Sequence, residues 1–272
     1  MKNQNNLTLG ILITTMNQWI NRVKKELLLQ LKNVDEIIIS HQITDKKIFP
    51  ENIDNIKKYH KNIKYVFMNE KWLSKNRNNA LKSSTTDICH ICDDDLNYIE
   101  LFENIIKEEY KKNNYDIISF QAENEEWKKH FKVKEWKHNI FSILKIWSWG
   151  ITFRRKSILD NKILFDENFW LWAKYPVSEE NIFLTDCYRN RLKIFHNNNS
   201  IVIHSDESSW INYENRKDLI IARIKVFKKL FWFIWWFVWI FYFTILHYKY
   251  YKKYFSIREF FILSFKSFIN EK

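Results

Sequence analysis

The feature that most constrains this chain is a short apolar run, residues 87–95, that ends in three consecutive carboxylates, Asp93, Asp94 and Asp95. A run of this length, bounded by charge, is typical of a strand buried on both faces of a mostly parallel sheet. In such sheets, ligands bind just outside the carboxyl ends of the strands. Adjacent carboxylates repel each other unless a cation neutralises them, and their oxygens suit Mg²⁺ or Mn²⁺. Taken alone, three consecutive aspartates are more often a solvated acidic turn than a metal site. The choice between the two depends on the other segments of the chain.

Predicted strands and helices alternate on both sides of this run. The alternation indicates an α/β fold with a Rossmann-like, mostly parallel central sheet that has helices on both faces. The predicted strands are residues 7–15, 36–40, 64–68, 115–120, 149–153 and 201–204, and the predicted helices are residues 18–32, 53–59, 74–83, 96–112 and 178–192.

Two predicted helix starts and one predicted strand end carry side chains that could bind a ligand or take part in catalysis. Ser74 is a predicted N-cap, and the helix it begins would present Arg77 near free N–H groups that bind phosphate. Glu179 and Glu180 lie in a first helical turn, where the helix dipole favours acidic residues whether or not they do chemistry. The chemical alternative is a general base at the mouth of a cleft. His204 ends the last predicted strand, a position that is commonly structural unless the ring reaches a metal.

The ordered set of these segments resembles glycosyltransferase family 2, the inverting sugar-nucleotide transferases with a GT-A fold. The resemblance implies metal-dependent transfer of a sugar from a nucleoside-diphosphate donor to a glycan or lipid-linked acceptor, with Mn²⁺ or Mg²⁺ as cofactor. The matching stretches are IIISHQ (37–42), LSKNRNNAL (73–81), DICHICDDD (87–95), FDENF (165–169), SEENIFLTDCY (178–188) and IVIHSDESS (201–209).

The resemblance also implies a role for each matching residue. Asp93 and Asp95 match the DxD motif, with Asp95 as the principal metal ligand and Asp93 nearer the nucleotide. Glu180 matches the catalytic base, Glu179 supports it, and His204 matches the histidine that completes the metal or diphosphate site. The remaining residues assigned to nucleotide-sugar binding are Thr15, Arg77 and Asp94. The His41-Gln42 pair stands where the family often has an acidic residue that contacts the base, which leaves the nucleotide open.

The positive charge of the chain is concentrated in residues 216–272. The whole chain has a net charge of +12, and this segment holds 12 Lys and Arg against 3 Asp and Glu. The weak charge of the remainder argues against a nucleic-acid partner, and the basic tail favours an anionic membrane surface. Residues 230–246 carry no charge and would form about 26 Å of helix, at the lower edge of spanning length. We therefore predict a GT-A domain at 1–215 and a helical tail at 216–272 that lies in the membrane interface or spans once. The alternative for residues 230–246 is a helix buried in a protein core.

The N-terminal residues lack a hydrophobic signal region, which predicts that the body lies at the cytoplasmic face of the membrane. Two other functions remain open from the sequence. One is a different Mg²⁺- or Mn²⁺-dependent phosphoryl-transfer enzyme, such as a nucleotidyltransferase or nuclease, and the other is a non-catalytic, membrane-tethered sugar-nucleotide-binding module. A two-metal mechanism would need further carboxylates around residues 93–95, and the weak charge of the body argues against a polyanionic substrate.

Glycine is unusually rare and tryptophan unusually common in this chain. There are 2 Gly and 13 Trp, whereas ordinary usage would give about 7% Gly. We predict that several of these tryptophans are encoded by UGA, which some bacteria translate as glycine. Glycines in the tail would turn a tryptophan stripe, typical of an interfacial helix, into GxxxG spacings that favour spanning. The positions concerned are Trp72, Trp170, Trp172 and Trp210, where the family usually has Gly, and Trp232, Trp235, Trp236 and Trp239 in the tail.

Overall fold

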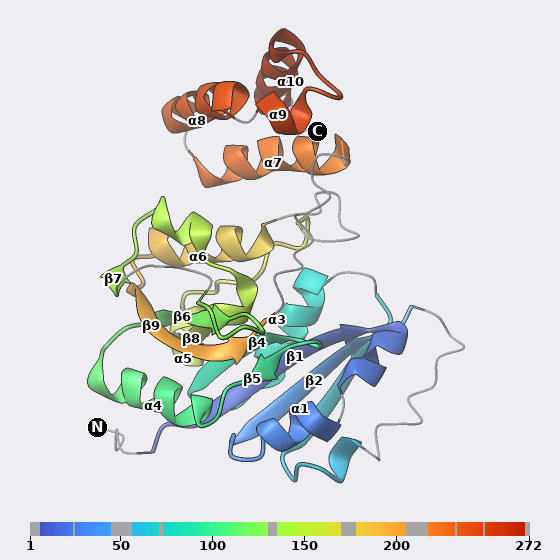
Figure 1. Cartoon of the computed structure of the whole chain (residues 1–272), viewed down its shortest axis with the longest axis vertical. Helices are drawn as coiled ribbons and strands as arrows, with labels where there is room; N and C mark the ends of the chain where they lie inside the picture. Colours follow the sequence, from blue (N-terminus) through green and yellow to red (C-terminus); the bar gives the residue numbers. More distant parts are fainter. Residues whose placement is uncertain are drawn as a thin grey trace.

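The protein is described here by a computed structural model that covers residues 6–23, 25–44, 56–70, 73–129, 135–169, 178–204, 217–231, 233–246 and 248–269. The predicted α/β fold is confirmed, with a central sheet flanked by helices (Figure 1). The described strands are β1 (Leu9–Met16), β2 (Glu36–Gln42), β3 (Ile63–Met68), β4 (Ile88–Asp93), β5 (Asn97–Tyr98), β6 (Ile117–Glu123), β7 (Trp136–Lys137), β8 (Ile151–Arg154) and β9 (Ile194–Ile203).

The helices alternate with these strands and then continue alone through the C-terminal segment. The α-helices are α1 (Lys25–Gln30), α3 (Leu73–Ser83), α4 (Phe102–Lys112), α5 (Arg155–Asp160), α6 (Glu179–Arg189), α7 (Lys217–Leu230), α8 (Phe233–Leu246), α9 (Tyr248–Tyr251) and α10 (Ile257–Ile269). Short 3-10 helices are η1 (Asn17–Arg22), η2 (Ser142–Lys145) and η3 (Ser148–Gly150).

The sheet is parallel in one half and mixed in the other. Its order is β3-β2-β1-β4-β8-β6-β9-β5, with β7 paired to β9. Strands β3, β2, β1 and β4 are parallel, whereas β8 is antiparallel to both β4 and β6. The register aligns Thr14 of β1 with Asp93 of β4. The carboxyl ends of these two strands therefore lie side by side, as the sequence predicted for the acidic run.

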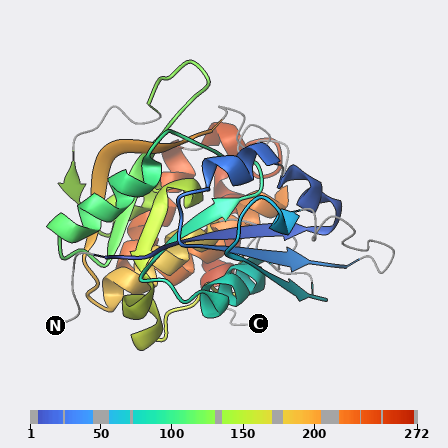
Figure 2. The ribbon, with the colours of Figure 1, turned by 90° about the horizontal axis from the view of Figure 1, so that it is seen from below.

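Helices cover both faces of the sheet (Figure 2). Successive side chains of each central strand alternate between these two faces. On one face, Ile11 and Ile13 join a core with Leu28 of α1 and Ile106 of α4. On the other face, Leu12 joins a second core contributed by α3, α5 and α6. This burial on both faces is why the central strands read as continuous apolar runs.

Several element boundaries differ from those expected. Residues 96–112 are not one helix, because Asn97–Tyr98 pair with β9 before α4 begins. Residues 18–32 divide into η1 and α1, and β9 is a strand of 10 residues where a four-residue strand was predicted. Ser74 is not an N-cap: it lies inside α3, and its hydroxyl donates to the Phe169 carbonyl at 2.8 Å. For residues 97–98, β9 and Ser74, a strand pairing or a tertiary hydrogen bond sets the structure that local pattern left open.

The C-terminal helices form a separate layer that docks on the sheet domain through α6 (Figure 1). Ile182 of α6 and Phe169 belong to the same apolar cluster as side chains of α7, α8 and α10. Residues 230–246 are not one helix, because α7 ends at Leu230 and α8 begins at Phe233. Within the described ranges, we find no helix with the length and apolar character needed to cross a bilayer.

Several sequence predictions fall outside the described residues. These are Trp72, Trp170, Trp172, Trp210 and Trp232, the start of the helix predicted at 53–59, and the end of the IVIHSDESS stretch. Trp236 is described and is buried in the C-terminal cluster, where it packs with α7 and α10 side chains.

Candidate active site

The three aspartates emerge at the carboxyl end of β4, and each has a different environment. Asp94 is buried and accepts a hydrogen bond of 2.6 Å from the hydroxyl of Thr15, which lies near the carboxyl end of the neighbouring strand β1. Arg22 of η1 donates to the other Asp94 oxygen at 3.4 Å and lies 3.8 Å from Asp95. The Asp95 side chain is 57% exposed. Of the three, Asp95 is therefore the carboxylate most accessible to a ligand from solvent.

Helix α3 delivers polar side chains to the same edge of the sheet. Asn76 is fully buried and donates to the carbonyls of Thr15 and Ser40, at 3.1 and 3.0 Å. It thus joins α3 to the ends of β1 and β2. These bonds give the buried Asn76 amide two backbone acceptors near the carboxyl ends of the strands. The NRNN segment, polar yet largely buried, is explained by this position over the strand ends.

Arg77 is the centre of a buried ion network. Its guanidinium donates to Asp93 at 3.0 Å and to Glu179 at 2.6 Å, and its side chain is only 1% exposed. Arg77 therefore links the acidic run of β4 to the start of α6, two segments far apart in sequence. Arg77 is thus sequestered between two carboxylates and does not present a free cation at a helix start.

Helix α6 brings two glutamates and a tail arginine together. Ser178 precedes the helix with φ 64°, a left-handed conformation that non-glycine residues seldom adopt. Glu179 is fully buried against Arg77, whereas Glu180 is half-buried. Arg223 of α7 donates to the Ser178 hydroxyl at 2.9 Å, so the C-terminal segment contacts the turn that carries both glutamates.

Burial shifts the proton affinity of these carboxyl groups. Desolvation raises the pKa of Asp94 to about 6, and the charges of Asp95 and Asp93 act in the same direction. Burial also raises the pKa of Glu179 well above its usual range, with further upward pressure from Glu180 and opposition from Arg77. The pKa of Glu180 is raised by burial too, while Arg77 and Arg223 favour its charged form. A carboxyl with a raised pKa binds and releases protons closer to neutral pH, as a general base must.

The donor atoms at the end of β4 fit Mg²⁺ or Mn²⁺ in kind. Carboxylate oxygens from Asp93 and Asp95 are hard ligands, and Mg²⁺ is typically held by one or two carboxylates together with substrate phosphates. Over the part of the chain that is described, no three or more His, Cys, Asp or Glu side chains form a ready-made metal cluster. Phosphate oxygens of a substrate could complete the coordination of a metal held by Asp93 and Asp95.

His204, the third predicted metal ligand, lies at the end of β9. Its backbone N–H donates to the Glu123 carbonyl at 2.8 Å. Its ring stacks on Trp149, with centroids 6.1 Å apart. A metal-binding role for His204 stays a prediction.

Three residues that contact the predicted site were not identified from the sequence. They are Arg22 on Asp94, Arg223 on Ser178, and Ser148, whose hydroxyl donates to Asp93 at 3.3 Å. None of the three belongs to a local sequence motif, because each is brought to the site only by the tertiary structure. The segment around Ser148 follows a stretch, 123–145, whose sequence pattern carries no functional signal. A search for basic and hydroxyl residues could not have separated them from the many on the surface.

Comparison with solved structures shows a likeness over nearly the whole chain. The crystal structure of S. aureus TarS 1-349 superposes with a TM-score of 0.68 at 14% identity, covering 97% of this chain and 80% of that one. The crystal structure of TarS 1-349 in complex with UDP-GlcNAc gives a TM-score of 0.69 at 13% identity, covering 97% and 81%. The likeness confirms the predicted GT-A fold. No curated protein sequence matches the chain significantly.

The family comparison covers the residues that build the site. The model of the family described as glycosyl transferase family 2 matches residues 11–180, more than half of the chain. The matched range begins in β1 and ends at Glu180, so it includes Thr15, Arg77 and all three aspartates. The predicted enzyme class is thereby confirmed, in preference to a phosphoryl-transfer enzyme or a non-catalytic binding module. The chain belongs to glycosyl transferase family 2 and is a glycosyltransferase.

Proposed function

We propose that the protein transfers a sugar from a nucleoside-diphosphate donor to an acceptor hydroxyl, with inversion of the anomeric centre. The observation that carries the proposal is the Arg77 bridge, which joins Asp93 at the strand end to Glu179 beside Glu180. One guanidinium thus fixes the spacing between a carboxylate pair suited to a diphosphate-bound cation and a carboxylate suited to a base. The complexes of TarS with UDP and UDP-GlcNAc support a nucleotide-sugar donor.

The roles of the residues follow from their environments. Glu180, half-buried and with a raised pKa, accepts the proton of the attacking hydroxyl. Glu179, fully buried against Arg77, holds the start of α6 in place. Asp94, held by Thr15 and Arg22, contacts the nucleoside side of the donor. A single displacement with one base inverts the anomeric centre.

A divalent cation would be held by Asp95 and Asp93 together with the donor phosphates. When bound, Mg²⁺ or Mn²⁺ supplies Lewis-acid stabilisation of the leaving diphosphate. Asp95→Asn should abolish metal-dependent release of nucleoside diphosphate while leaving the fold intact. Unchanged release in that variant would remove Asp95 from the site.

The test of the function is a donor screen. Nucleoside-diphosphate sugars are incubated with the full chain, and release of the diphosphate is followed with and without Mn²⁺. We expect release with at least one donor, and loss of that release in Glu180→Gln while the nucleotide still binds. A chain that binds no nucleotide under any of these conditions would refute the proposal.

The C-terminal helices support a second part of the proposal, association with an anionic membrane surface at the cytoplasmic face. One stripe of α8 is exposed, and α10 exposes further apolar side chains beside lysines of α9 and the following turn. Apolar side chains next to basic ones suit the boundary between headgroups and acyl chains. The exposed stripe of α8 consists of Phe237, Val238, Phe241, Tyr242, Ile245 and Leu246.

Vesicle sedimentation tests this part separately from catalysis. The full chain should sediment with vesicles containing anionic lipid and much less with purely zwitterionic ones. Replacing the exposed pair Phe241 and Ile245 with Asp should abolish sedimentation without changing nucleotide binding, because both side chains are already in solvent. Equal recovery of wild type and double variant in the supernatant would refute the lipid surface.

A further inference from the structure

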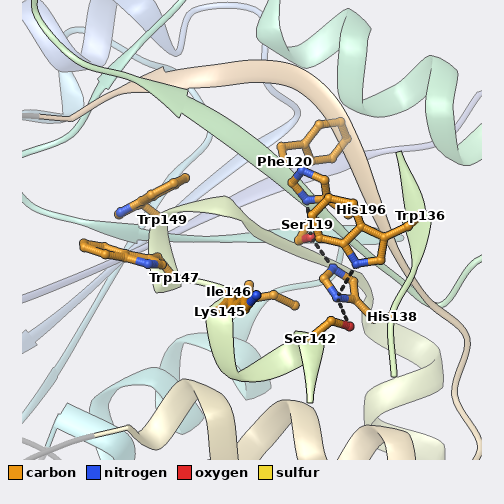
Figure 3. A pocket seen from close by; sticks show the side chains of 10 residues that line it. All are labelled: Ser119, Phe120, Trp136, His138, Ser142, Lys145, Ile146, Trp147, Trp149 and His196. Carbon is orange, nitrogen blue, oxygen red and sulfur yellow. Dashed lines mark hydrogen bonds between the residues drawn. The ribbon is translucent and has the colours of Figure 1, made fainter. Parts of the chain in front are cut away.

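A cavity of about 250 Å³ lies beside the active site, between η2, η3 and the strands β6, β7 and β9 (Figure 3). Trp147 and Trp149 line one side, and Trp136, His138 and His196 line the other (Figure 3). The surface that faces the cavity is mostly apolar. None of the residues singled out from the sequence lines this cavity.

The polar groups of the cavity wall are bonded to one another. Trp136 donates its indole N–H to Nδ1 of His138 at 3.2 Å, so Nδ1 is an acceptor and Nε2 carries the proton. Nε2 of His138 then donates to the Ser119 hydroxyl at 2.9 Å. Gln121 donates to Nε2 of His196 at 3.3 Å, so Nδ1 of His196 carries the proton and donates to the same Ser119 hydroxyl at 2.9 Å. The chain of bonds requires both imidazoles to be neutral. Burial agrees, since it lowers the pKa of His138 to about 3 and that of His196 to about 4.

This internal bonding limits what the cavity can hold. A sugar ring placed there would bring hydroxyl groups against apolar side chains and against Ser119, His138 and His196, whose polar atoms already bond to one another, and unbonded buried hydroxyls are costly. An apolar group meets no such penalty and gains by leaving water. An apolar cavity of about 150 Å³ is known to take benzene, so 250 Å³ has room for a group of roughly ten carbons.

The cavity is joined to the active site through both of its catalytic carboxylate regions. Ser148, between the two tryptophans, donates to Asp93. Asn181, the residue after Glu180, donates to the carbonyls of Ile143 and Ile146 at 3.3 and 3.4 Å, and Ile146 lines the cavity. In sheet order the cavity lies on the β8 side of β4, opposite the β1 side where Thr15 holds Asp94. A group in the cavity therefore belongs to the substrate that approaches from the side away from Asp94.

We propose that this cavity binds the apolar aglycone of the acceptor, a hydrocarbon chain or aromatic ring, next to an anionic group held at the mouth by Lys145. Lys145 lines the cavity, and its side chain is exposed, so its charge can reach a phosphate without being buried. The proposal rests on the proposed function, because it names the class of acceptor for that reaction. It also favours a lipid-linked or aryl-linked acceptor over a plain glycan.

Binding of three phosphates that share an anion but differ in the attached group tests the proposal directly. Geranyl phosphate, 2-naphthyl phosphate and glucose 1-phosphate are titrated into the full chain by calorimetry. We expect saturable binding of geranyl or naphthyl phosphate, and the tighter of the two distinguishes a chain from a ring. Tighter binding of glucose 1-phosphate, or no saturable binding of either apolar phosphate, would overturn the proposal.

Variants locate the binding in the cavity. Trp147→Ala should weaken binding of the apolar phosphate by about tenfold or more, because one of the two tryptophans on that side of the cavity is lost. Lys145→Glu, at an exposed position that does not threaten folding, should weaken geranyl phosphate more than geraniol. Trp127→Ala removes an exposed tryptophan outside the cavity and should change neither the affinity for geranyl phosphate nor that for geraniol. Equal effects of Trp127→Ala and Trp147→Ala, or no effect of Lys145→Glu, would contradict the assignment.

Nucleotide binding keeps this test separate from that of the proposed function. UDP affinity should be the same in wild type, Trp147→Ala and Lys145→Glu, because the cavity lies on the far side of Asp93. A wild type that binds geranyl phosphate but no nucleotide would refute the proposed function and keep the apolar site. A wild type that binds UDP but no apolar phosphate would refute the apolar site and leave the proposed function in place.

Discussion

The two sides of Asp93 treat buried polar groups in opposite ways. On the side of β1 and α3, charges are retained and paired, with Arg77 between Asp93 and Glu179 and Arg22 on Asp94. On the side of β6 and β9, the Ser119, His138 and His196 network is neutral and closed on itself. Both sides are buried at the same end of one sheet, so burial alone does not decide whether a group stays charged.

The difference indicates what each side is built to receive. Paired charges with one exposed carboxylate, Asp95, leave a place for a cation and a charged substrate. A mostly apolar wall, with the charge of Lys145 only at its mouth, favours a ligand whose buried part is apolar. A transferase that joins a charged donor to an apolar acceptor needs both kinds of surface close together.

The largest expected effect is on the charged side, from removal of Arg77. Arg77→Met leaves Asp93 and Glu179 facing each other without their shared cation, and breaking a buried pair typically costs about 3–5 kcal/mol. We expect that loss in the free energy of unfolding, measured by urea denaturation. Lys75→Met, on the exposed side of the same helix, is the control and should change stability little. Equal stability of the two variants would mean that the Arg77 network is not a structural unit.

The next effect separates the two glutamates. Glu180→Gln should lower kcat by about 10²-fold or more, since a general base contributes at least that much. Its UDP affinity and stability should be unchanged. Glu179→Gln should instead lower stability, because it weakens the pair with Arg77. If Glu179→Gln lowers kcat more than Glu180→Gln does, the two roles are reversed.

The charged side was predictable from the sequence to a much greater extent than the neutral side. The acidic run, the two glutamates and Arg77 belong to local patterns at strand and helix ends, and the parallel register brings Thr14 level with Asp93. The cavity comes from residues scattered over β6, β7, η2, η3 and β9, none of which forms a local motif. Its polar side chains could not be recognised as a network from the sequence, because their hydrogen bonds join segments up to 77 residues apart in the chain.

Some helix and strand boundaries were predicted wrongly for a related reason. The pattern of residues 96–112 suits a helix throughout, but pairing of Asn97 and Tyr98 with β9 takes the first turn into the sheet. Nε2 of His90 donates to the Trp149 carbonyl at 2.8 Å, so its Nδ1 accepts a hydrogen bond of 2.9 Å from the Tyr98 hydroxyl. Local propensity is a weak prior, and a tertiary pairing with a distant strand overrides it here.

The pH dependence of stability should have opposite signs on the two sides. The folded pKa of His196 is lowered, to about 4, so its contribution to stability is present above pH 6.5 and is lost as pH falls toward 4. The folded pKa of Asp94 is raised, to about 6, so its contribution is present below pH 3.8 and is lost as pH rises through 6. Each group contributes a slope of up to about 1.4 kcal/mol per pH unit.

Two variants check these signs by urea denaturation between pH 4 and 7. His196→Gln should reduce the loss of stability on acidification, and Asp94→Asn should increase it, each relative to wild type. Slopes that change in the same direction in both variants would contradict the division between a charged and a neutral side.

A smaller effect tests whether the C-terminal helices influence the base. Arg223 favours the charged form of Glu180, so Arg223→Met should raise the pKa of Glu180 and move the acid limb of the kcat profile to higher pH. The control is Arg189→Met, which removes bonds from α6 to the Lys229 and Leu230 carbonyls of α7 without that charge effect. An acid limb that moves equally in both variants would mean that only docking of the tail matters.

The last comparison depends on whether the tryptophans are genuine. Trp127 has φ 59° at the end of a tight turn, where Asn124 accepts from the Trp127 N–H and donates to the Lys128 carbonyl, both at 2.9 Å. A left-handed residue at this point of a hairpin is usually glycine. In the described part of the chain, six non-glycine residues have positive φ and neither glycine does. The backbone thus calls for glycine where the sequence has tryptophan, in addition to the positions predicted from the family.

Trp127→Gly should therefore raise the free energy of unfolding by about 1 kcal/mol, because it relieves the left-handed strain. Lys128→Gly is the control and should lower it, because that position has no such strain to relieve. The intact mass of the protein purified from its own source then decides whether nature already made the change. Glycine at 127 alone leaves the aromatic wall of the cavity in place. Glycine at 136, 147 or 149 would remove part of that aromatic wall and let water into the cavity. The apolar surface on which the proposed acceptor site depends would then be lost.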